Sequence, residues 1–494
     1  MNKPLRRTAI FCGLLMLALL IRANWLQYVK ADDLATDDSN RRVLINRFAT
    51  PRGDILVGGT PITGSVATGG SDLKYKRTYK NGPMYAPVTG YASQSMGMNF
   101  LEKTYDGVLS GQGDELAFQR FTDVVTGEKR RGGEVLTTID AKAQKAGYDG
   151  LTRLGARGSV VALDPRTGKV LALVSTPSYD PSVFAGNSLK EGDRFKALDE
   201  DKGKPLANRA LRETFPPGST FKILTAAAAL EHGVVKDVDA RSDAVSPYPL
   251  PQSTNKISSE AGDAACDRAS LKTAMQYSCN NVFLDAAVKL GADRLRETAE
   301  KFGFNKDVYS SDFGDLRASA SLYPRDLDKP GTALTGMGQG SLTSTPLQMA
   351  MVTAAIVNDG KLMQPYIVDQ VQSPDLTTLK KNEPKVMSQA VSAETARKVR
   401  EMMEFTAKEG SAKRALIDGI TVGGKTGTAQ RGVDVRKLVP YGWFVSYGVR
   451  PDGRSVAVAV FIDPTAMDIA REDISGGGLA APIARNVMKA VLSR

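Results

Sequence analysis

The chain has 494 residues, of which 42% are hydrophobic and 24% charged, so wholesale disorder is excluded and two or more domains are expected. Its formal net charge is +11, but no long basic run is interleaved with aromatic residues, so we expect no nucleic-acid partner. The single histidine, His232, excludes a histidine metal cluster and disfavours a Ser-His-Asp triad; we expect neither a metal nor a cofactor.

The first 30 residues predict a membrane anchor. Lys3, Arg6 and Arg7 precede an apolar run from Ala9 to Ile21. That run is short for a spanning helix of about 20 residues, but interfacial residues follow and extend it. A cleaved signal peptide is the alternative, and the absence of a small-x-small cleavage site after the run favours a retained anchor. Because basic flanks stay in the cytoplasm, the chain after residue 30 is expected outside.

Residues 31 to 150 are polar and rich in glycine. The stretch TPRGDILVGGTPITGS indicates short strands broken by glycine and proline turns. Leu101, Tyr105 and Leu109 are spaced at i, i+4 and i+8, which predicts one face of a helix. A strand is expected from Val135 to Ile139, and Asp140 would cap a helix that begins directly after it.

After residue 157 long apolar strands appear. GSVVALDPRTGKVLALVS predicts a hairpin around the turn at residues 164–168. Three more strands are predicted in GITVGGKTGTAQ, YGWFVSYGVR and RSVAVAVFID. Helices are predicted between them in STFKILTAAAALEHG, LKTAMQYSCNNVFLDAAVKLG and TPLQMAMVTAAIVNDG, and after them in AAPIARNVMKAVLSR. Early and late strands in one sheet, with helices between them, predict a helix-and-sheet sandwich.

The segment FPPGSTFKIL places Ser219 at a helix start and Lys222 one turn later, on the same face. A serine hydroxyl is a weak nucleophile until a base takes its proton. A lysine can be that base only where burial or positive neighbours lower its pKa. Unpaired N–H groups at the helix start also suit a developing oxyanion. A lone S-x-x-K match, however, is usually an ordinary capped helix.

Two further motifs favour catalysis. YSCNN contains an S-x-N triplet at Ser278 and Asn280, with Cys279 between them where aspartate is common. GGKTGTAQ contains a K-T-G triplet. S-x-x-K, S-x-N and K-T-G in this order form the joint signature of penicillin-binding proteins and class A β-lactamases. We expect Ser278 to relay a proton, and Asn280 to bind Lys222 and a substrate amide.

The residues of the third motif are expected to hold the substrate. Lys425 supplies positive charge, and the hydroxyls of Thr426 and Thr428 can bind a carboxylate. Gly427 leaves room where the substrate lies along the strand. The backbone N–H groups of Ser219 and Thr428 can together form an oxyanion hole.

Two cysteines lie in the part of the chain expected outside the membrane. A bridge between Cys266 and Cys279 is feasible there, because disulfides persist in oxidising compartments. Two buried thiols are the alternative. Cys12 lies within the predicted anchor.

Beyond these motifs, the chain resembles the class B penicillin-binding proteins, and within them an actinobacterial subgroup. The similarity lies in GSVVALDPRTGKVLALVSTPSYDP, NRALRETFPPGSTFK, GQGSLTSTPLQMA and GWFVSY for the transpeptidase domain, and in PRGDILVGG and LEKTYDGVLSG for the N-terminal region. The resemblance implies an α/β (α+β) transpeptidase domain, built on a five-stranded antiparallel sheet with helices on both faces. It also implies a smaller mixed N-terminal domain and one transmembrane helix. We expect the anchor in residues 1–30, a non-catalytic pedestal in 31–155 and the transpeptidase domain in 156–494.

The family reaction is peptidoglycan D,D-transpeptidation. A donor stem peptide ending in D-Ala-D-Ala would acylate Ser219 and release its last D-Ala, with Lys222 as the usual general base. An acceptor amine from a neighbouring strand would then close the cross-link. β-Lactams would imitate the donor. The implied partners are stem peptides and a membrane glycosyltransferase of the shape, elongation, division and sporulation type.

Two other functions compete with this one. A D,D-carboxypeptidase or β-lactamase-type hydrolase has the same fold, but β-lactamases are usually compact and released, so an anchor and a pedestal favour the transpeptidase. A non-catalytic β-lactam sensor would carry a cytoplasmic signalling domain, and only a short tail precedes the predicted anchor here.

Overall fold

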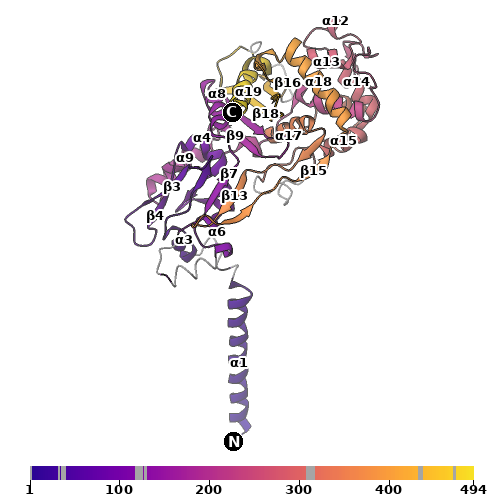
Figure 1. The fold of residues 1–494 in the computed structure, drawn as a ribbon. Helices are drawn as coiled ribbons and strands as arrows, with labels where there is room; N and C mark the ends of the chain where they lie inside the picture. The colour runs from indigo at the N-terminus through magenta and orange to yellow at the C-terminus, as the bar shows by residue number, and fades with distance from the viewer. Residues whose placement is uncertain are drawn as a thin grey trace.

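The computed structural model describes residues 3–31, 34, 41–116, 126, 131–306, 317–431, 438–470 and 474–493. Helix α1 stands apart at the N-terminus, followed by an elongated middle part and a larger head that contains the C-terminus (Figure 1).

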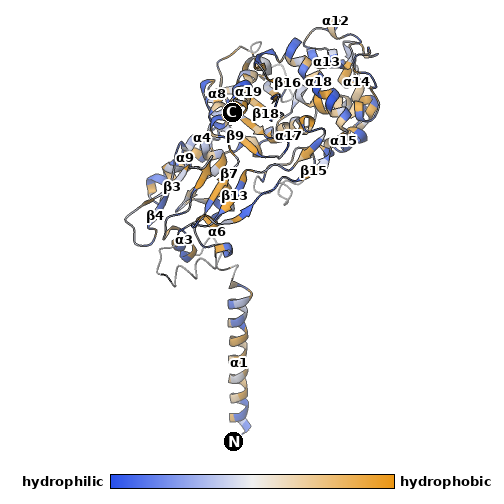
Figure 2. Ribbon diagram, in the orientation of Figure 1, coloured by the Kyte–Doolittle hydropathy of each residue, from blue (hydrophilic) through white to orange (hydrophobic). Residues whose placement is uncertain are grey.

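Helix α1 (Lys3–Tyr28) is long and apolar enough to cross a membrane. Its 26 residues give a length of about 39 Å at 1.5 Å per residue, against about 30 Å for a bilayer core. The helix continues past the apolar run, and the guanidinium of Arg22 lies 4.3 Å from the centre of the Trp25 ring. None of its residues is buried against protein, and apolar residues colour most of its length in Figure 2. A signal sequence near the N-terminus meets the same criteria of length and composition.

The middle part is built on a five-stranded sheet in the order β14-β13-β7-β1-β2. Strand β7 pairs in parallel with β1 and antiparallel with β13. Two of the five strands therefore come from far along the chain, a pairing that no local pattern indicated. The strand expected from Val135 to Ile139 is β7, shifted by one to two residues. The five strands are β1 (Ile55–Val57), β2 (Thr60–Pro61), β7 (Glu134–Thr137), β13 (Val368–Gln372) and β14 (Thr378–Lys381).

Short elements surround this sheet. They are α3 (Arg41–Phe48), β3 (Thr63–Ala67), β4 (Tyr75–Tyr79), α4 (Gly82–Thr89), β5 (Ala92–Ser93), β6 (Gly97–Met98), α5 (Phe100–Thr104), α6 (Asp106–Leu109) and η1 (Asp114–Leu116). The single helix expected through Leu101 and Leu109 is wrong, because the chain breaks at Tyr105 into α5 and α6. The break places Asp106 against the buried guanidinium of Arg52, at 2.6 Å. Such a pairing is what makes a buried charge tolerable.

The head contains the predicted five-stranded antiparallel sheet, in the order β16-β17-β18-β8-β9. All five predicted strands are present, and the early hairpin pairs with the late strands through β18 and β8. They are β8 (Arg157–Leu163), β9 (Val170–Thr176), β16 (Thr421–Ala429), β17 (Tyr441–Val449) and β18 (Ser455–Asp463).

Helices cover both faces of this sheet (Figure 1). Side chains alternate along β18, so Val458 and Val460 pack with α8 (Ala141–Arg153) and α19 (Ala481–Leu492). Phe461 belongs to the opposite cluster, with α11 (Lys222–Glu231) and α17 (Pro346–Val357). That cluster also includes Ile55 and Val135, so one apolar core joins the middle part to the head.

Helix α9 (Leu189–Glu200) lies beside β3 and β4 in the middle part (Figure 1), and the short turn η2 (Pro181–Phe184) contacts β4 there. The remaining helices are α10 (Arg209–Arg212), α12 (Asp263–Cys266), α13 (Leu271–Tyr277), α14 (Asn281–Leu290), α15 (Ala292–Lys301), α16 (Lys329–Gly336) and α18 (Ala393–Glu409). The remaining short elements are η3 (Gly218–Phe221), β10 (Tyr248–Pro249), β11 (Lys256–Ile257), β12 (Lys361–Met363), β15 (Val386–Gln389), η5 (Lys413–Ala415), η6 (Pro464–Ala466) and η8 (Gly476–Ala480). The continuous helix expected across residues 271–291 is wrong: it breaks after Tyr277, where Ser278 adopts a left-handed conformation with φ 60°.

Candidate active site

Ser219 lies in the tight turn η3, directly before α11. In a 3₁₀ turn, residues i and i+3 eclipse each other, so Ser219 and Lys222 still project from the same side. Gly218, with φ +53°, lets this turn lie close to strand β16, because a Cβ at this position would lie 3.0 Å from the carbonyl oxygen of Thr428. The N–H of Gly218 donates to the carbonyl of Gly338 at 2.9 Å. The nucleophile turn is therefore held against strand β16.

Gly427, on β16, has a packing role in addition to the one expected from its motif. A Cβ at this position would lie 2.9 Å from Thr220 Cγ2 and 3.2 Å from the Thr220 backbone nitrogen. The glycine therefore lets the strand touch the turn that carries Ser219. The neighbouring Thr426 hydroxyl shares a hydrogen bond of 2.9 Å with Ser411, a contact that sequence reasoning missed.

Two buried lysines meet at one serine hydroxyl. Lys222 Nζ donates to the Ser278 carbonyl at 2.7 Å, to Asn280 Oδ1 at 2.7 Å and to Ser278 Oγ at 3.3 Å. Lys425 Nζ donates to Ser278 Oγ at 2.8 Å and to the carbonyl of Thr426 at 2.9 Å. Both lysine side chains are fully buried. The structure thus brings the three motifs together around Ser278.

Ser219 is half-buried and, within the described part of the chain, its hydroxyl makes no hydrogen bond. Lys222 donates to Ser278 and Asn280 instead. Hydrogen bonds to a nucleophile are often loose in a site without substrate and tighten when substrate binds.

The bend at Ser278 aims its carbonyl at Lys222, and a disulfide holds it. The predicted bridge between Cys266 and Cys279 is confirmed, with the two Cα atoms 5.5 Å apart. Asn281 donates through Nδ2 to the carbonyl of Cys266 at 2.7 Å. Cys279, the middle residue of the S-x-N triplet, is therefore covalently bound to a separate helix, α12. This bond limits the movement of Ser278 and Asn280, the residues on either side of Cys279.

A turn at residues 258–262 completes the site, and no motif pointed to it. The backbone N–H of Asn280 donates to Ser259 Oγ at 2.9 Å, and Asn280 Nδ2 donates to the Ser258 carbonyl at 2.8 Å. One amide hydrogen of Asn280 is thus committed to this turn, which leaves the other for a substrate. The exposed side chain of Glu260 follows directly.

Burial decides the electrostatics of the lysine pair. It lowers the pKa of Lys222 well below its usual value, the charge of Lys425 lowers it further, and Glu260 partly offsets both. Burial also lowers the pKa of Lys425 to about 7, against an opposing effect of Glu260. A lysine with a lowered pKa can be neutral near pH 7, which is the state a general base needs.

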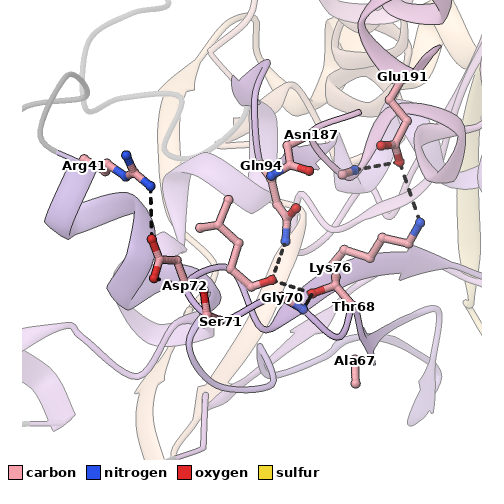
Figure 3. Close-up of a pocket in the computed structure, with 12 residues that line it drawn as sticks. Arg41, Ala67, Thr68, Gly70, Ser71, Asp72, Lys76, Gln94, Asn187 and Glu191 are labelled. Atoms are coloured by element: carbon pink, nitrogen blue, oxygen red, sulfur yellow. Dashed lines mark hydrogen bonds and ion pairs between the residues drawn. The ribbon is translucent and has the colours of Figure 1, made fainter. Parts of the chain in front are cut away.

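A cavity of about 520 Å³ in the middle part shares no residue with this site (Figure 3). Its polar groups pair with one another: Arg41 with Asp72 at 3.0 Å, and Lys76 with Glu191 at 3.6 Å. None of the three sequence motifs contributes a residue to its lining. No cluster of metal-ligating side chains occurs in the ranges the structure describes.

Comparisons with known proteins agree with this geometry. Residues 158–489 match the penicillin binding protein transpeptidase domain, and residues 52–135 match the penicillin binding protein A dimerisation domain. The chain is 38% identical to the peptidoglycan D,D-transpeptidase PbpA of Mycolicibacterium smegmatis, covering 100% of this chain and 99% of that relative.

Two solved structures of penicillin-binding protein A from M. tuberculosis are similar at 36% identity. The ceftriaxone acyl-enzyme complex has a TM-score of 0.85 and covers 91% of this chain and 100% of its own. The penicillin G acyl-enzyme complex has a TM-score of 0.82 and covers 90% and 100%.

We predict a bell-shaped pH dependence for acylation by benzylpenicillin. The rate should rise as Lys222 loses its proton, and fall as Lys425 loses its charge above a pKa of about 7. Lys425→Arg keeps the charge at any accessible pH, so the alkaline fall should move to higher pH while the acid limb stays. The measurement is the second-order acylation rate constant across pH. If the rate of the variant fell at the same alkaline pH as that of the wild type, a group other than Lys425 would be responsible for the fall.

Proposed function

The chain belongs to the class B penicillin-binding proteins and carries their transpeptidase domain, and we propose that it is a peptidoglycan D,D-transpeptidase with Ser219 as its nucleophile. One observation carries the assignment. Lys222 and Lys425 are buried together on Ser278, beside the turn that holds Ser219 against β16. A buried lysine without a carboxylate partner is costly, and it is a device for supplying a neutral amine at physiological pH.

The proposed acylation begins with neutral Lys222 taking the proton of the Ser219 hydroxyl. The serine oxygen attacks the carbonyl carbon between the last two D-Ala residues of the donor. The backbone N–H groups of Ser219 and Thr428 stabilise the oxyanion. Ser278, which already contacts both lysines, returns the proton to the leaving D-Ala nitrogen. The C–N bond breaks and a Ser219 ester remains.

The donor lies along β16 in this proposal. Lys425 with the hydroxyls of Thr426 and Thr428 binds its terminal carboxylate, and Gly427 admits its backbone. Asn280 binds a donor amide with its remaining hydrogen. A β-lactam follows the same route and stops at the ester.

Ser219→Ala should abolish covalent labelling by fluorescent penicillin, because no other group carries the ester. Ser278→Ala is the matched control. It keeps the nucleophile and loses a proton relay, so it should still label, about 10²- to 10⁴-fold more slowly. In-gel fluorescence after timed exposure measures both. Undiminished labelling of the Ser219 variant would place the nucleophile elsewhere.

A D,D-carboxypeptidase or β-lactamase-type hydrolase is the alternative, and the fate of the ester separates the two. We expect the penicillin ester of Ser219 to persist for minutes or longer, because a transpeptidase must keep its acyl-enzyme for an amine. Stopped-flow acylation followed by intact-protein mass spectrometry gives the lifetime. Release of the penicillin product within seconds would favour the hydrolase.

We propose that α1 anchors the chain in the cell membrane, with the basic N-terminal residues in the cytoplasm and the catalytic head outside. The basic flank and the helix length support this orientation. The Cys266–Cys279 disulfide supports it too, since disulfides persist outside the cytoplasm. Residues 31–155 are then the pedestal and 156–494 the transpeptidase domain, except that α8 packs on the sheet of the head and that β13 and β14 belong to the sheet of the middle part. A membrane glycosyltransferase of the shape, elongation, division and sporulation type is the proposed partner.

The full chain should fractionate with membranes and, in mild detergent, co-purify with that glycosyltransferase. Residues 31–494 alone should appear in the soluble fraction and still label with penicillin, because no residue of α1 packs against the head. Fractionation, labelling and mass spectrometry of co-purified proteins make the comparison. A full chain found in the soluble fraction would contradict the anchor.

A further inference from the structure

The turn beside Asn280 is fixed on both sides. The N–H of Gly262 donates to the carbonyl of Ser259 at 3.1 Å, which closes the turn around Glu260. Asp263 accepts from the N–H of Ser259 at 3.3 Å and from the hydroxyl of Ser246 at 2.6 Å. The Ser259 hydroxyl accepts from the N–H of Asn280. Glu260 is therefore presented at a set place, one residue from a direct contact with the S-x-N triplet.

Glu260 is an unpaired carboxylate beside a cationic site. Its side chain is exposed, and it has no ion-pair partner among the described residues. Two lysines, Lys222 and Lys425, face the site from α11 and β16. Glu260 is the one carboxylate of the described chain whose charge raises the pKa of both. The negative charge of Glu260 therefore acts on the region around Lys222 and Lys425, where the substrates are proposed to bind.

The two substrates of a transpeptidase differ in charge. The donor brings a carboxylate, which suits Lys425. The acceptor brings an amine, which is cationic in water and is repelled by a site that holds only lysines. A carboxylate at the rim would attract it. Neither the donor-binding residues nor the proton relay uses Glu260, so its position and charge are free for this role.

We propose that Glu260 binds the cationic amine of the acceptor strand and thereby favours cross-linking over hydrolysis of the Ser219 ester. This inference rests on the proposed function. The bound ammonium gives one proton to solvent and becomes the nucleophile. Its nitrogen attacks the ester carbonyl, the new C–N bond forms, and the C–Oγ bond to Ser219 breaks. A second amine proton passes through Lys222 and Ser278 to Ser219 Oγ, which restores the enzyme.

The test is acyl transfer by the full chain from a small D-alanyl thioester donor to two acceptors. D-Alaninamide is a cation, whereas D-alanine is a zwitterion with no net charge. Glu260→Gln should lower the ratio of aminolysis to hydrolysis with D-alaninamide about 5- to 10-fold, and change it much less with D-alanine. Benzylpenicillin acylation, measured for each chain at its own pH optimum, should stay within about 2-fold, because the donor does not use Glu260.

Two further variants sharpen the result. Glu260→Asp keeps the charge and should retain most of the preference for D-alaninamide. Glu297→Gln removes an exposed carboxylate of α15 that pairs with Lys301, and should change nothing. An unchanged aminolysis ratio in Glu260→Gln, with penicillin labelling intact, overturns this inference alone. A wild-type chain that neither labels with penicillin nor turns over the donor overturns the proposed function with it.

Discussion

The contact on which the site depends is the shared hydroxyl of Ser278, which receives hydrogen bonds from Lys222 and Lys425. Two ammonium groups this close repel each other, and both are buried, so the charged state is penalised twice. The hydrogen-bond acceptors around them are neutral oxygens, which hold the amines in place without restoring a full counter-charge. The result is a pair of lysines with lowered pKa values beside a serine. The rest of the fold must therefore offset the unfavourable free energy of burying these two lysines together.

The surroundings of the pair explain how it does so. Strand β16 is an edge strand, but it pairs with β17 along its whole length and the faces of the sheet are both covered, so Lys425 stays where the sheet places it. Helix α11 packs its alanines into the same core and fixes Lys222. The third element, Ser278, sits on a strained left-handed bend, and the disulfide at the next residue holds that bend closed. Rigid packing and a covalent tie offset the strain and repulsion that the chemistry requires.

The middle part is joined to this head more firmly than a linked pedestal would be. Strands β13 and β14 come from between two helices of the head, yet they belong to the sheet of the middle part, where β13 pairs with β7 and β14 pairs with β13. The apolar core is continuous across the junction. A force or a partner acting on the middle part therefore acts on elements that also belong to the head.

The sequence alone determined the chemistry and most of the head. Three short motifs predict the residues that meet at Ser278, and apolar strand patterns predict the central sheet of the head. Both could be predicted because motif residues and strand periodicity are local properties of the sequence. Tertiary structure decided the rest. The pairing of β13 with β7, the break at Ser278, the packing of Gly427 on Thr220, and the turn that presents Glu260 all depend on segments distant in the chain. No local pattern encodes such contacts, since each exists only once the core has brought its two sides together.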